Sequence, residues 1–368
     1  MSDFEFGNGF IVAIAHSEKA LKELRGEEKN VLYKDDEGYI FLPSEYRLLK
    51  IEDSAKEMLD GLNEFDVVEF FADNNFHILY SSASNDNALF ITNKCNSNCI
   101  MCPCSEHFRQ KPCNETVEHL CKIAEYIPSD TRFLTITGGE PTLLFTDMFQ
   151  LLLTLRNHFE GTKFFLLTNG RSFSDKVFLK GFLENMPCNM RFAIPLYGYD
   201  SATHDYITQA PGSFIQTVKG LKNLIAAHCE IEIRIVVSKL NYMHMDKLAD
   251  FIVNELQGIT CVHIMATEMM GAAAKNRVDV WLDYADAFNS SKYAIKTLMK
   301  NGIDVELYNF PLCKVEKGYW PLCAKSISDY KIRYGESCEN CEVKSLCGGV
   351  FRSTLLLTKM KLEPIAGV

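Results

Sequence analysis

Three cysteines close together in the chain have the residue type and spacing of an iron–sulfur ligand set. Cys95, Cys99 and Cys102 form a C-x3-C-x2-C run. Three thiolates on one loop can hold three irons of a [4Fe–4S] cluster and leave the fourth iron open, since a closed cluster needs four ligands. A zinc site completed by another group, such as His107, is the alternative, but zinc sites usually pair two C-x2-C knuckles. The spacing therefore favours a cluster with one open iron.

A Gly-Gly-Glu-Pro sequence marks a second place where a ligand could approach the backbone. Gly138, Gly139, Glu140 and Pro141 directly follow an apolar run at 133–137 that is typical of a strand. Paired glycines at a strand end allow close contact with the main chain. Alone, these four residues could be a simple turn. Because they come one strand–helix unit after the cysteine loop, we expect both motifs at the same rim of a sheet.

The elements that must position these residues begin near residue 88, where short apolar runs alternate with segments of helical periodicity. This alternation is typical of strand–helix units around a parallel sheet. About six such units predict an α/β protein with a partial (β/α)6 TIM-like barrel, in which function sits at the carboxyl ends of the strands. The expected strands span 88–92, 133–137, 163–167, 190–194, 231–237, 261–266 and 304–307.

The helices between these strands show one apolar face each. One of them places four apolar side chains at i, i+3, i+4 and i+7 (Val117, Leu120, Cys121 and Ala124). A second helix is expected after Ser213, whose hydroxyl is well placed to cap it. A third runs over about 284–300 and ends at an Asn-Gly pair.

The chain divides into three parts by pattern. We expect a small N-terminal mixed β domain at 1–87, the core barrel at 88–302, and an irregular, cysteine-rich module at 303–368. The N-terminal part has no catalytic constellation. It could dock a peptide by strand addition or cap the barrel, and we favour the cap.

Composition limits the function classes. The 368 residues carry a net charge of −10, which argues against a general nucleic-acid binder. The chain starts without a signal-peptide pattern, and no window approaches the roughly 18 apolar residues of a membrane span. These features predict a cytoplasmic protein without a membrane partner. In that compartment clustered cysteines more often mean metal or redox chemistry than disulfides.

The chain has 14 cysteines, and several show no ligand spacing. We interpret Cys104 and Cys113 as spare or weakly structural thiols beside the first cluster, because their spacing adds nothing regular. Free cysteine is among the most buried residue types. Cys121, Cys188, Cys229 and Cys261 are therefore interpreted as small hydrophobic residues.

The first two motifs together resemble the radical S-adenosylmethionine (radical SAM) superfamily. Cys95, Cys99 and Cys102 match its cluster loop, and residues 138–141 match the element that in this family binds the amino group of SAM. The resemblance implies that SAM chelates the open iron. Met101 is a departure, since the family usually has an aromatic residue there. A methionine can still pack on an adenine ring through its sulfur.

The resemblance also implies further cofactor-binding residues. Asn169, in Thr-Asn-Gly, closes the third strand as a similar element does in these barrels. Pro195 and Gln209 stand near the places where peptide-modifying members contact the ribose and carboxylate of SAM, and Tyr197, Gln209 and Arg234 are the candidates for these contacts. For each of these three residues a structural role is the alternative. No further catalytic residue is assigned beyond the cluster.

A third cysteine run near the C-terminus looks like part of the SPASM or twitch modules, which hold auxiliary iron–sulfur clusters. Cys338, Cys341 and Cys347 form a C-x2-C-x5-C run. The resemblance implies one auxiliary [4Fe–4S] cluster, whose fourth ligand is Cys313 or Cys323, and we favour Cys313. A tetrahedral zinc site with the same cysteines is the alternative.

A finer resemblance joins several short strings between residue 60 and the C-terminus. They look like the His-Xaa-Ser system radical SAM maturase of the C type: Thr137-Gly-Gly-Glu-Pro-Thr-Leu, Glu232-Ile-Arg, Tyr308-Asn-Phe-Pro-Leu-Cys313, Trp320-Pro and Cys347-Gly-Gly-Val-Phe. Members are encoded with a small His-Xaa-Ser repeat polypeptide, their presumed substrate, and with a second radical SAM maturase.

The chemistry that the resemblance implies is reductive cleavage of SAM to a 5′-deoxyadenosyl radical, which abstracts hydrogen from a small, ribosomally made precursor peptide. A flavodoxin- or ferredoxin-type protein would supply the electron. The alternatives are sulfatase-maturase-like oxidation of a protein, a small-molecule radical SAM enzyme, and a zinc-stabilised binding protein without turnover.

Overall fold

A parallel sheet of eight strands forms the centre of the computed structural model, which describes residues 10–36, 38–43, 46–47, 53–71, 76–111, 116–328 and 330–367. The strand order is β14-β13-β12-β11-β10-β9-β8-β7, and every neighbouring pair is parallel. The strands are β7 (Ala88–Phe90), β8 (Phe133–Thr137), β9 (Lys163–Leu167), β10 (Met190–Pro195), β11 (Glu230–Val237), β12 (Cys261–Ala266), β13 (Asp304–Tyr308) and β14 (Cys323–Ala324).

All seven expected strands are present, and the predicted α/β partial barrel is confirmed. The first strand ends at Phe90, two residues before the predicted end at Thr92, because the chain turns there into the cysteine loop. The sheet also gains β14 at its far edge. Since β13 and β14 both follow residue 303, the main sheet continues past the predicted boundary of the core.

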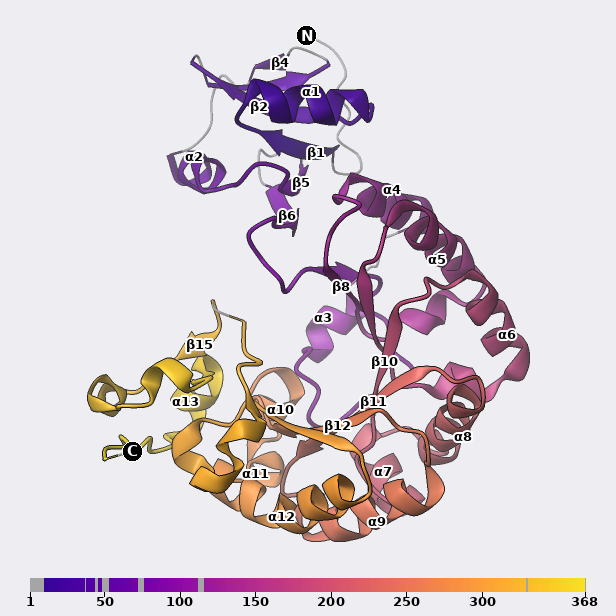
Figure 1. Ribbon diagram of the computed structural model, residues 1–368, viewed down its shortest axis with the longest axis vertical. Coiled ribbons are helices and arrows are strands. Elements are labelled where there is room, and N and C mark those ends of the chain that lie inside the picture. The colour runs from indigo at the N-terminus through magenta and orange to yellow at the C-terminus, as the bar shows by residue number, and fades with distance from the viewer. Residues whose placement is uncertain are drawn as a thin grey trace.

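The longer helices cover the outer side of the sheet, which curves as an arc in Figure 1. They are α4 (Val117–Tyr126), α5 (Asp147–His158), α6 (Lys176–Asn185), α8 (Ser213–Ala226), α9 (Met245–Glu255) and α12 (Tyr284–Lys300). The shorter helices are α3 (Glu106–Gln110), α7 (Ser201–Thr208), α10 (Gly271–Lys275) and α11 (Arg277–Val280), and Figure 1 shows α3 on the inner side of the arc. Strand residues alternate in direction. In β11, Ile231, Ile233 and Ile235 join the core beneath the helices, whereas Glu232 and Arg234 point to the inner side of the arc.

The start of α8 differs from the prediction. Gly212, in a left-handed conformation (φ 79°), precedes the helix, and Ser213 is its first residue rather than its cap. The carboxylate of Asp205 accepts hydrogen bonds from the Ser213 hydroxyl (2.8 Å) and from the N–H groups of Gly212 and Phe214 (both 2.7 Å). The prediction of a serine cap was therefore wrong, because an ionised acceptor in α7 takes that role.

The N-terminal part forms a separate six-stranded sheet in the order β4-β3-β2-β1-β5-β6. Strands β1 and β2 are parallel and the other pairs antiparallel. The elements are β1 (Phe10–Ala15), α1 (Glu18–Gly26), β2 (Val31–Asp35), β3 (Gly38–Leu42), β4 (Tyr46–Arg47), α2 (Asp53–Asp60), β5 (Val67–Phe70) and β6 (Phe76–Tyr80).

This sheet is joined to the barrel beside α4 and the loop that enters β8. The Tyr126 hydroxyl accepts from the N–H of Asn30 (3.0 Å), and the Thr131 hydroxyl donates to the hydroxyl of Tyr80 (3.1 Å). His119 of α4 lies 3.2 Å from the carboxylate of Glu69. The entry to β8 is the amino end of a strand, so this contact is at the opposite end of the strands from the cysteine loop.

The C-terminal module is built from short turns and little regular structure. It contains a two-stranded antiparallel pair, β15 (Ile332–Arg333) with β16 (Val350–Phe351), and the helix α13 (Arg352–Thr358). It lies beside α10 and α11 in Figure 1. A structure with so few backbone ladders needs other cross-links, and its cysteines are candidates for that role.

Candidate functional site

The cysteine loop and the Gly-Gly-Glu-Pro element meet at one rim of the main sheet. Parallel pairing of β7 with β8 brings their carboxyl ends together. The contact continues beyond the strands, where the N–H of Gly139 donates to the carbonyl of Thr92 (2.6 Å) and the N–H of Glu140 to that of Lys94 (2.8 Å). Cys95 follows immediately. The two motifs are therefore adjacent in space as well as close in sequence.

The two glycines are required by this close approach. A Cβ atom at Gly138 (φ 155°) would lie 2.5 Å from the carbonyl oxygen of Thr92, and one at Gly139 only 2.2 Å from that of Lys94. Carbon–oxygen contacts this short are not tolerated by real side chains. The backbone of the cysteine loop thus occupies the space where the side chains of residues 138 and 139 would lie. This reason for two consecutive glycines could not be found from the sequence pattern.

Glu140 is fully buried and joins three segments. Its carboxylate accepts from the N–H and hydroxyl of Thr142 (3.1 and 2.6 Å), the hydroxyl of Thr168 (2.6 Å) and the N–H of Asn169 (2.6 Å). Burial raises the pKa of Glu140, while these four hydrogen bonds oppose that rise. Glu140 therefore connects the predicted SAM-binding element to the Thr-Asn-Gly element after β9. Pro141 follows it as a buried residue.

Polar side chains from neighbouring segments hold the cysteine loop in place. Arg171 donates through Nη1 to the carbonyl of Asn96 (2.5 Å) and to the hydroxyl of Ser97 (3.1 Å). The amide of Asn169 donates to the side-chain oxygen of Asn96 (2.6 Å). From the other side, the N–H of Ala272 donates to the carbonyl of Cys102 (2.8 Å). Sequence reasoning missed Arg171 and the segment at 271–276, since both contacts span more than 70 residues.

The three thiols of the loop lie near one another and partly out of solvent. Burial, with the neighbouring Cys102 and Cys95, raises the pKa of Cys99 to about 12. The N–H of Ser97 lies 3.4 Å from the sulfur of Cys95. A hydrogen bond from Cys104 lowers the pKa of Cys102 to about 6. Cys104 thus lies beside Cys102, in agreement with its interpretation as a thiol next to the first cluster.

Two other sequence-based interpretations can be compared with this loop. Cys113 lies outside the described residues. Met101 is buried in an apolar cluster with Ile207, Met269 and Ala273.

The three remaining SAM candidates lie in different surroundings. Burial raises the pKa of Tyr197 well above its usual value, and the nearby Cys99, Cys102 and Cys95 raise it further, which places this tyrosine beside the cysteines. Gln209 ends α7 in a left-handed conformation and lines a surface cleft of about 420 Å³ together with Cys99. Arg234 lies in β11 on the inner side of the arc. The structure thus brings Tyr197 to the loop, and it pairs Arg234 with Pro195 at the end of β10, two residues before Tyr197.

A group of charged side chains surrounds Arg234 and was not predicted. Glu232 accepts from Arg234 Nε (2.6 Å) and lies 2.9 Å from His263 Nδ1. Burial would raise the pKa of Glu232, but the nearby His263 and the charge of Arg234 outweigh it and bring the pKa to about 2. The Tyr308 ring stacks on His263 with centroids 4.3 Å apart. The sequence signal that could have revealed this group is the presence of polar residues at alternate positions of the strands 231–237 and 261–266.

Four C-terminal cysteines gather around one cavity. It is lined by Cys313, Cys338, Cys341 and Cys347, and Cys323 is not part of the lining. Three backbone N–H groups point at these sulfurs, with the N–H groups of Leu312 and Gly349 3.4 Å from Cys347 and that of Ile365 3.5 Å from Cys341. Backbone N–H groups on sulfur are the environment of thiolate metal ligands. The arrangement favours Cys313 over Cys323 as the fourth ligand.

The cysteines without assigned chemistry divide by exposure. Cys121 and Cys261 are buried and Cys229 is half-buried, whereas Cys188 is exposed. The interpretation of Cys188 as a buried hydrophobic residue was therefore wrong. The short segment between α6 and β10 leaves it at the surface.

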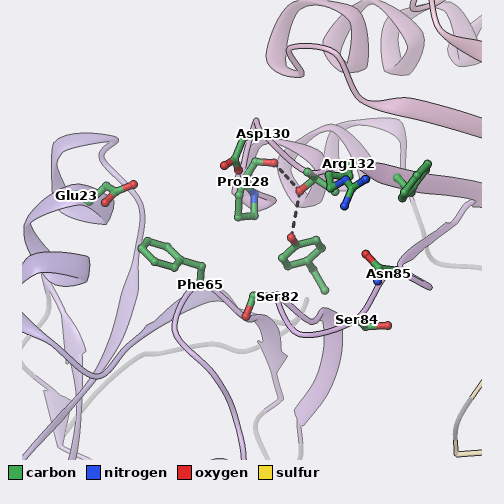
Figure 2. Close-up of a pocket in the computed structure, with 11 residues that line it drawn as sticks. Glu23, Phe65, Ser82, Ser84, Asn85, Pro128, Asp130 and Arg132 are labelled. Atoms are coloured by element: carbon green, nitrogen blue, oxygen red, sulfur yellow. Dashed lines mark hydrogen bonds between the residues drawn. The ribbon is translucent and has the colours of Figure 1, made fainter.

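A further cavity of about 330 Å³ lies between the N-terminal sheet and the entry to β8 (Figure 2). Figure 2 shows Phe65 and Ser82 on one side and Pro128 and Arg132 on the other. No cysteine, histidine or paired carboxylate lines it. It is a packing groove between two parts of the chain and carries none of the chemistry of the cysteine rim. In the described part of the chain, no helix is long and apolar enough to cross a bilayer.

Residues 89–252 match the model of the Radical SAM superfamily. This segment includes Cys95, Cys99, Cys102 and the Gly-Gly-Glu-Pro element. None of the curated proteins matches the chain. The chain therefore contains a radical SAM domain, as the sequence motifs predicted, and this domain supports the prediction of a radical SAM iron–sulfur enzyme.

Several solved structures are similar at low sequence identity. Streptococcus suis SuiB bound to precursor peptide SuiA has a TM-score of 0.48 and 16% identity, over 60% of this chain and 48% of that chain. Native anSMEcpe with bound AdoMet and Kp18Cys peptide has a TM-score of 0.47 and 16% identity, over 60% and 62%. A domain of pyruvate-formate lyase-activating enzyme from Bacteroides vulgatus has a TM-score of 0.36 and 16% identity, over 47% and 96%. The chain thus spans about half the length of SuiB.

Replacing Gly139 by alanine tests the close approach of the two motifs. The added methyl group would meet the carbonyl of Lys94 at 2.2 Å, so the strand end or the cysteine loop must shift. We expect Gly139→Ala to lower the free energy of unfolding by about 1–3 kcal/mol in urea titrations followed by circular dichroism. Gly318→Ala is the control, since a Cβ there meets nothing within 4 Å, and it should change stability by less than about 0.5 kcal/mol. Equal stability of the two variants would contradict the described contact.

Proposed function

We propose that this protein is a radical SAM maturase that modifies a ribosomally made His-Xaa-Ser repeat peptide by hydrogen abstraction. The observation that carries the proposal is the convergence of three thiols, Cys95, Cys99 and Cys102, with the Gly-Gly-Glu-Pro element at one rim of a parallel sheet. Both motifs fall within the segment that matches the radical SAM superfamily.

The residues present fit a cluster with one open iron. Three mutually close thiols come from one loop, and an N–H group already points at the sulfur of Cys95. When bound, the cluster and SAM supply the electron transfer and C–S cleavage that yield methionine and a 5′-deoxyadenosyl radical. The role of the protein is to hold one substrate hydrogen close to this radical and to exclude competing groups.

We assign the binding of SAM to residues around Glu140. Its hydrogen bonds fix the main chain at Thr142 and Asn169, and the N–H of Gly139 is held by the carbonyl of Thr92, so the polar backbone groups at this rim are already oriented. A site whose groups do not rearrange on binding loses less free energy to ordering. In this proposal Tyr197 closes the side of the site opposite Glu140.

The peptide enters from the inner side of the arc. Among the described strands, β7 and β14 are the two edges of the main sheet and do not pair with each other, so the barrel is open between them. A closed barrel of this type is filled by its own side chains. In this proposal the open side of the barrel admits an extended chain. The strings shared with the His-Xaa-Ser maturases support this substrate over a protein side chain or a small molecule.

We further propose that Cys313, Cys338, Cys341 and Cys347 hold one auxiliary [4Fe–4S] cluster. The cavity that they share and the N–H groups on two of the sulfurs support this ligand set. When bound, such a cluster can take up the electron left on an oxidised product. A crosslink or a dehydrogenation would release such an electron.

Incubation with the proposed substrate tests the function. Anaerobically reconstituted protein, SAM, a reductant and a His-Xaa-Ser repeat peptide should yield 5′-deoxyadenosine and a peptide of changed mass. The variant with Cys95, Cys99 and Cys102 replaced by alanine should yield neither. Formation of 5′-deoxyadenosine without any mass change on the peptide would show that the substrate is wrong. Cleavage of SAM by the triple variant would show that the cluster assignment is wrong.

Iron analysis of two single variants tests the auxiliary ligand set. The reconstituted protein should hold about eight iron atoms per chain, as expected for two cubane clusters. Cys313→Ala should bring the content toward about four, whereas Cys323→Ala, the matched control, should leave it near the wild-type value. Loss of iron from Cys323→Ala alone would exchange the two assignments. One or two zinc ions and negligible iron would contradict both clusters.

A further inference from the structure

The segment that follows α13 covers the cavity shared by the four C-terminal cysteines. Leu362, Glu363 and Ile365 line this cavity together with the four thiols. We call residues 360–367 the covering segment. It contains no cysteine or histidine, so it offers none of the residues that usually ligate an iron–sulfur cluster. Its influence on a cluster there is therefore expected to come from its backbone and its apolar side chains.

The covering segment is anchored in the main core of the protein. At Lys359 the chain leaves α13 in a left-handed conformation (φ 52°), a common way for a helix to end. Met360 and Leu362, which follow, are both buried in the main hydrophobic core. Burial of these two large apolar side chains stabilises this path of the chain without any metal.

Hydrogen bonds also tie the covering segment to the C-x2-C turn of the module. The hydroxyl of Ser337, which directly precedes this turn, donates to the carbonyl of Leu362 (2.6 Å). Glu342 directly follows the turn, and its N–H donates to the carbonyl of Ile365 (3.0 Å). The carboxylate of Glu342 accepts from the N–H of Gly367 (3.0 Å). The segment is thus held at both ends of the turn that carries two of the thiols.

The backbone of the covering segment reaches the sulfurs themselves. The N–H of Ile365 points at the sulfur of Cys341, 3.5 Å away. Burial raises the pKa of the Cys313 thiol, and the backbone N–H of Glu363 opposes that rise. Hydrogen bonds to the sulfurs and exposure to solvent are two of the factors that set the reduction potential of an iron–sulfur cluster. The segment is placed to act on both factors.

The two cysteine sites of the chain differ in how they are covered. The three-cysteine loop faces solvent, since Cys99 lines a surface cleft of about 420 Å³. The four-cysteine cavity is bounded on one side by the covering segment. The number of thiols agrees with this difference, because three thiolates leave one iron of a [4Fe–4S] cluster open and four leave none. The four-cysteine site is therefore built as a closed site.

We propose that residues 360–367 form a wall of the auxiliary cluster site, which shields the cluster from water and raises its reduction potential through the N–H of Ile365. This inference rests on the proposed function, which supplies the auxiliary cluster. A cluster with four thiolate ligands and this cover can exchange electrons but offers the peptide no open iron. A segment that merely packs on the module would affect neither the potential nor the release of iron.

Reduction potentials test the backbone contact. In the triple alanine variant of the three-cysteine loop only the auxiliary cluster remains, so a redox titration of the reconstituted chain, followed by electron paramagnetic resonance, reports that cluster alone. In this background Ile365→Pro removes the N–H and should lower the potential, because a donor stabilises the more negative, reduced cluster. Ala366→Pro is the matched control, since the N–H of Ala366 has no hydrogen-bond partner in the described part of the chain. It should leave the potential unchanged.

Release of iron to a ferrous chelator under anaerobic conditions tests the shielding in the same background. A chain that ends after Glu363 keeps the buried Met360 and Leu362 but lacks Ile365, and we expect it to release iron about 10- to 100-fold faster. Ile365→Ala keeps the N–H and opens the wall, so it should give a smaller increase, and it still applies if Ile365→Pro takes up no cluster. Lys361→Ala is the control, since Lys361 is exposed and does not line the cavity. Its rate should stay within about twofold.

Three outcomes would overturn the inference while the auxiliary cluster stands. One is a potential that Ile365→Pro does not shift. Another is an equal shift in Ala366→Pro, which would show that the N–H at the sulfur is not the cause. The third is an unchanged rate of iron release from the chain that ends after Glu363. If the triple alanine variant takes up no iron at all, the auxiliary cluster of the proposed function fails, and the inference falls with it.

Discussion

The buried carboxylate of Glu140 joins the segments on which the site depends. It accepts hydrogen bonds from Thr142 within its own turn and from Thr168 and Asn169 after the next strand. Its own N–H reaches back to Lys94, next to the first cysteine. A buried carboxylate without these four donors would be strongly destabilising. These hydrogen bonds therefore hold the three segments of the rim together and support the cysteine loop.

The two faces of the sheet serve different purposes. Outward positions such as Ile231, Ile233 and Ile235 bury apolar surface beneath the helices and hold the arc together. Inward positions do not pack beneath the helices. Because the sheet is open, these positions can carry charged residues, and they hold Glu232, Arg234 and their partners. Stability and chemistry are thus separated by the alternation of the strand, one residue to each side.

Local patterns were sufficient to predict the strands and the ligand spacing, but not the contacts between distant segments. Apolar runs and C-x3-C-x2-C spacing are properties of a few consecutive residues. The pair Glu232–His263 depends on the register between β11 and β12, which the sequence of either strand does not contain. Likewise, serine is a residue type that often caps a helix, and Ser213 was predicted to do so. Once α7 and α8 are in contact, the carboxylate of Asp205, eight residues earlier, is the better hydrogen-bond acceptor. Gly139 was recognised from the sequence as a place where a ligand could approach the backbone. The structure gives a different reason for the glycine, because the carbonyl of Lys94 lies where a Cβ atom would be.

The central claim is that Cys95, Cys99 and Cys102 hold a cluster whose open iron binds SAM, and electron–nuclear double resonance addresses it directly. The anaerobically reduced protein would be mixed with SAM carrying ¹⁵N in its amino group. We predict a ¹⁵N coupling large enough to require nitrogen bound to the cluster, together with a changed electron paramagnetic resonance spectrum on addition of SAM. A spectrum that SAM leaves unchanged, with no ¹⁵N coupling, would contradict the account.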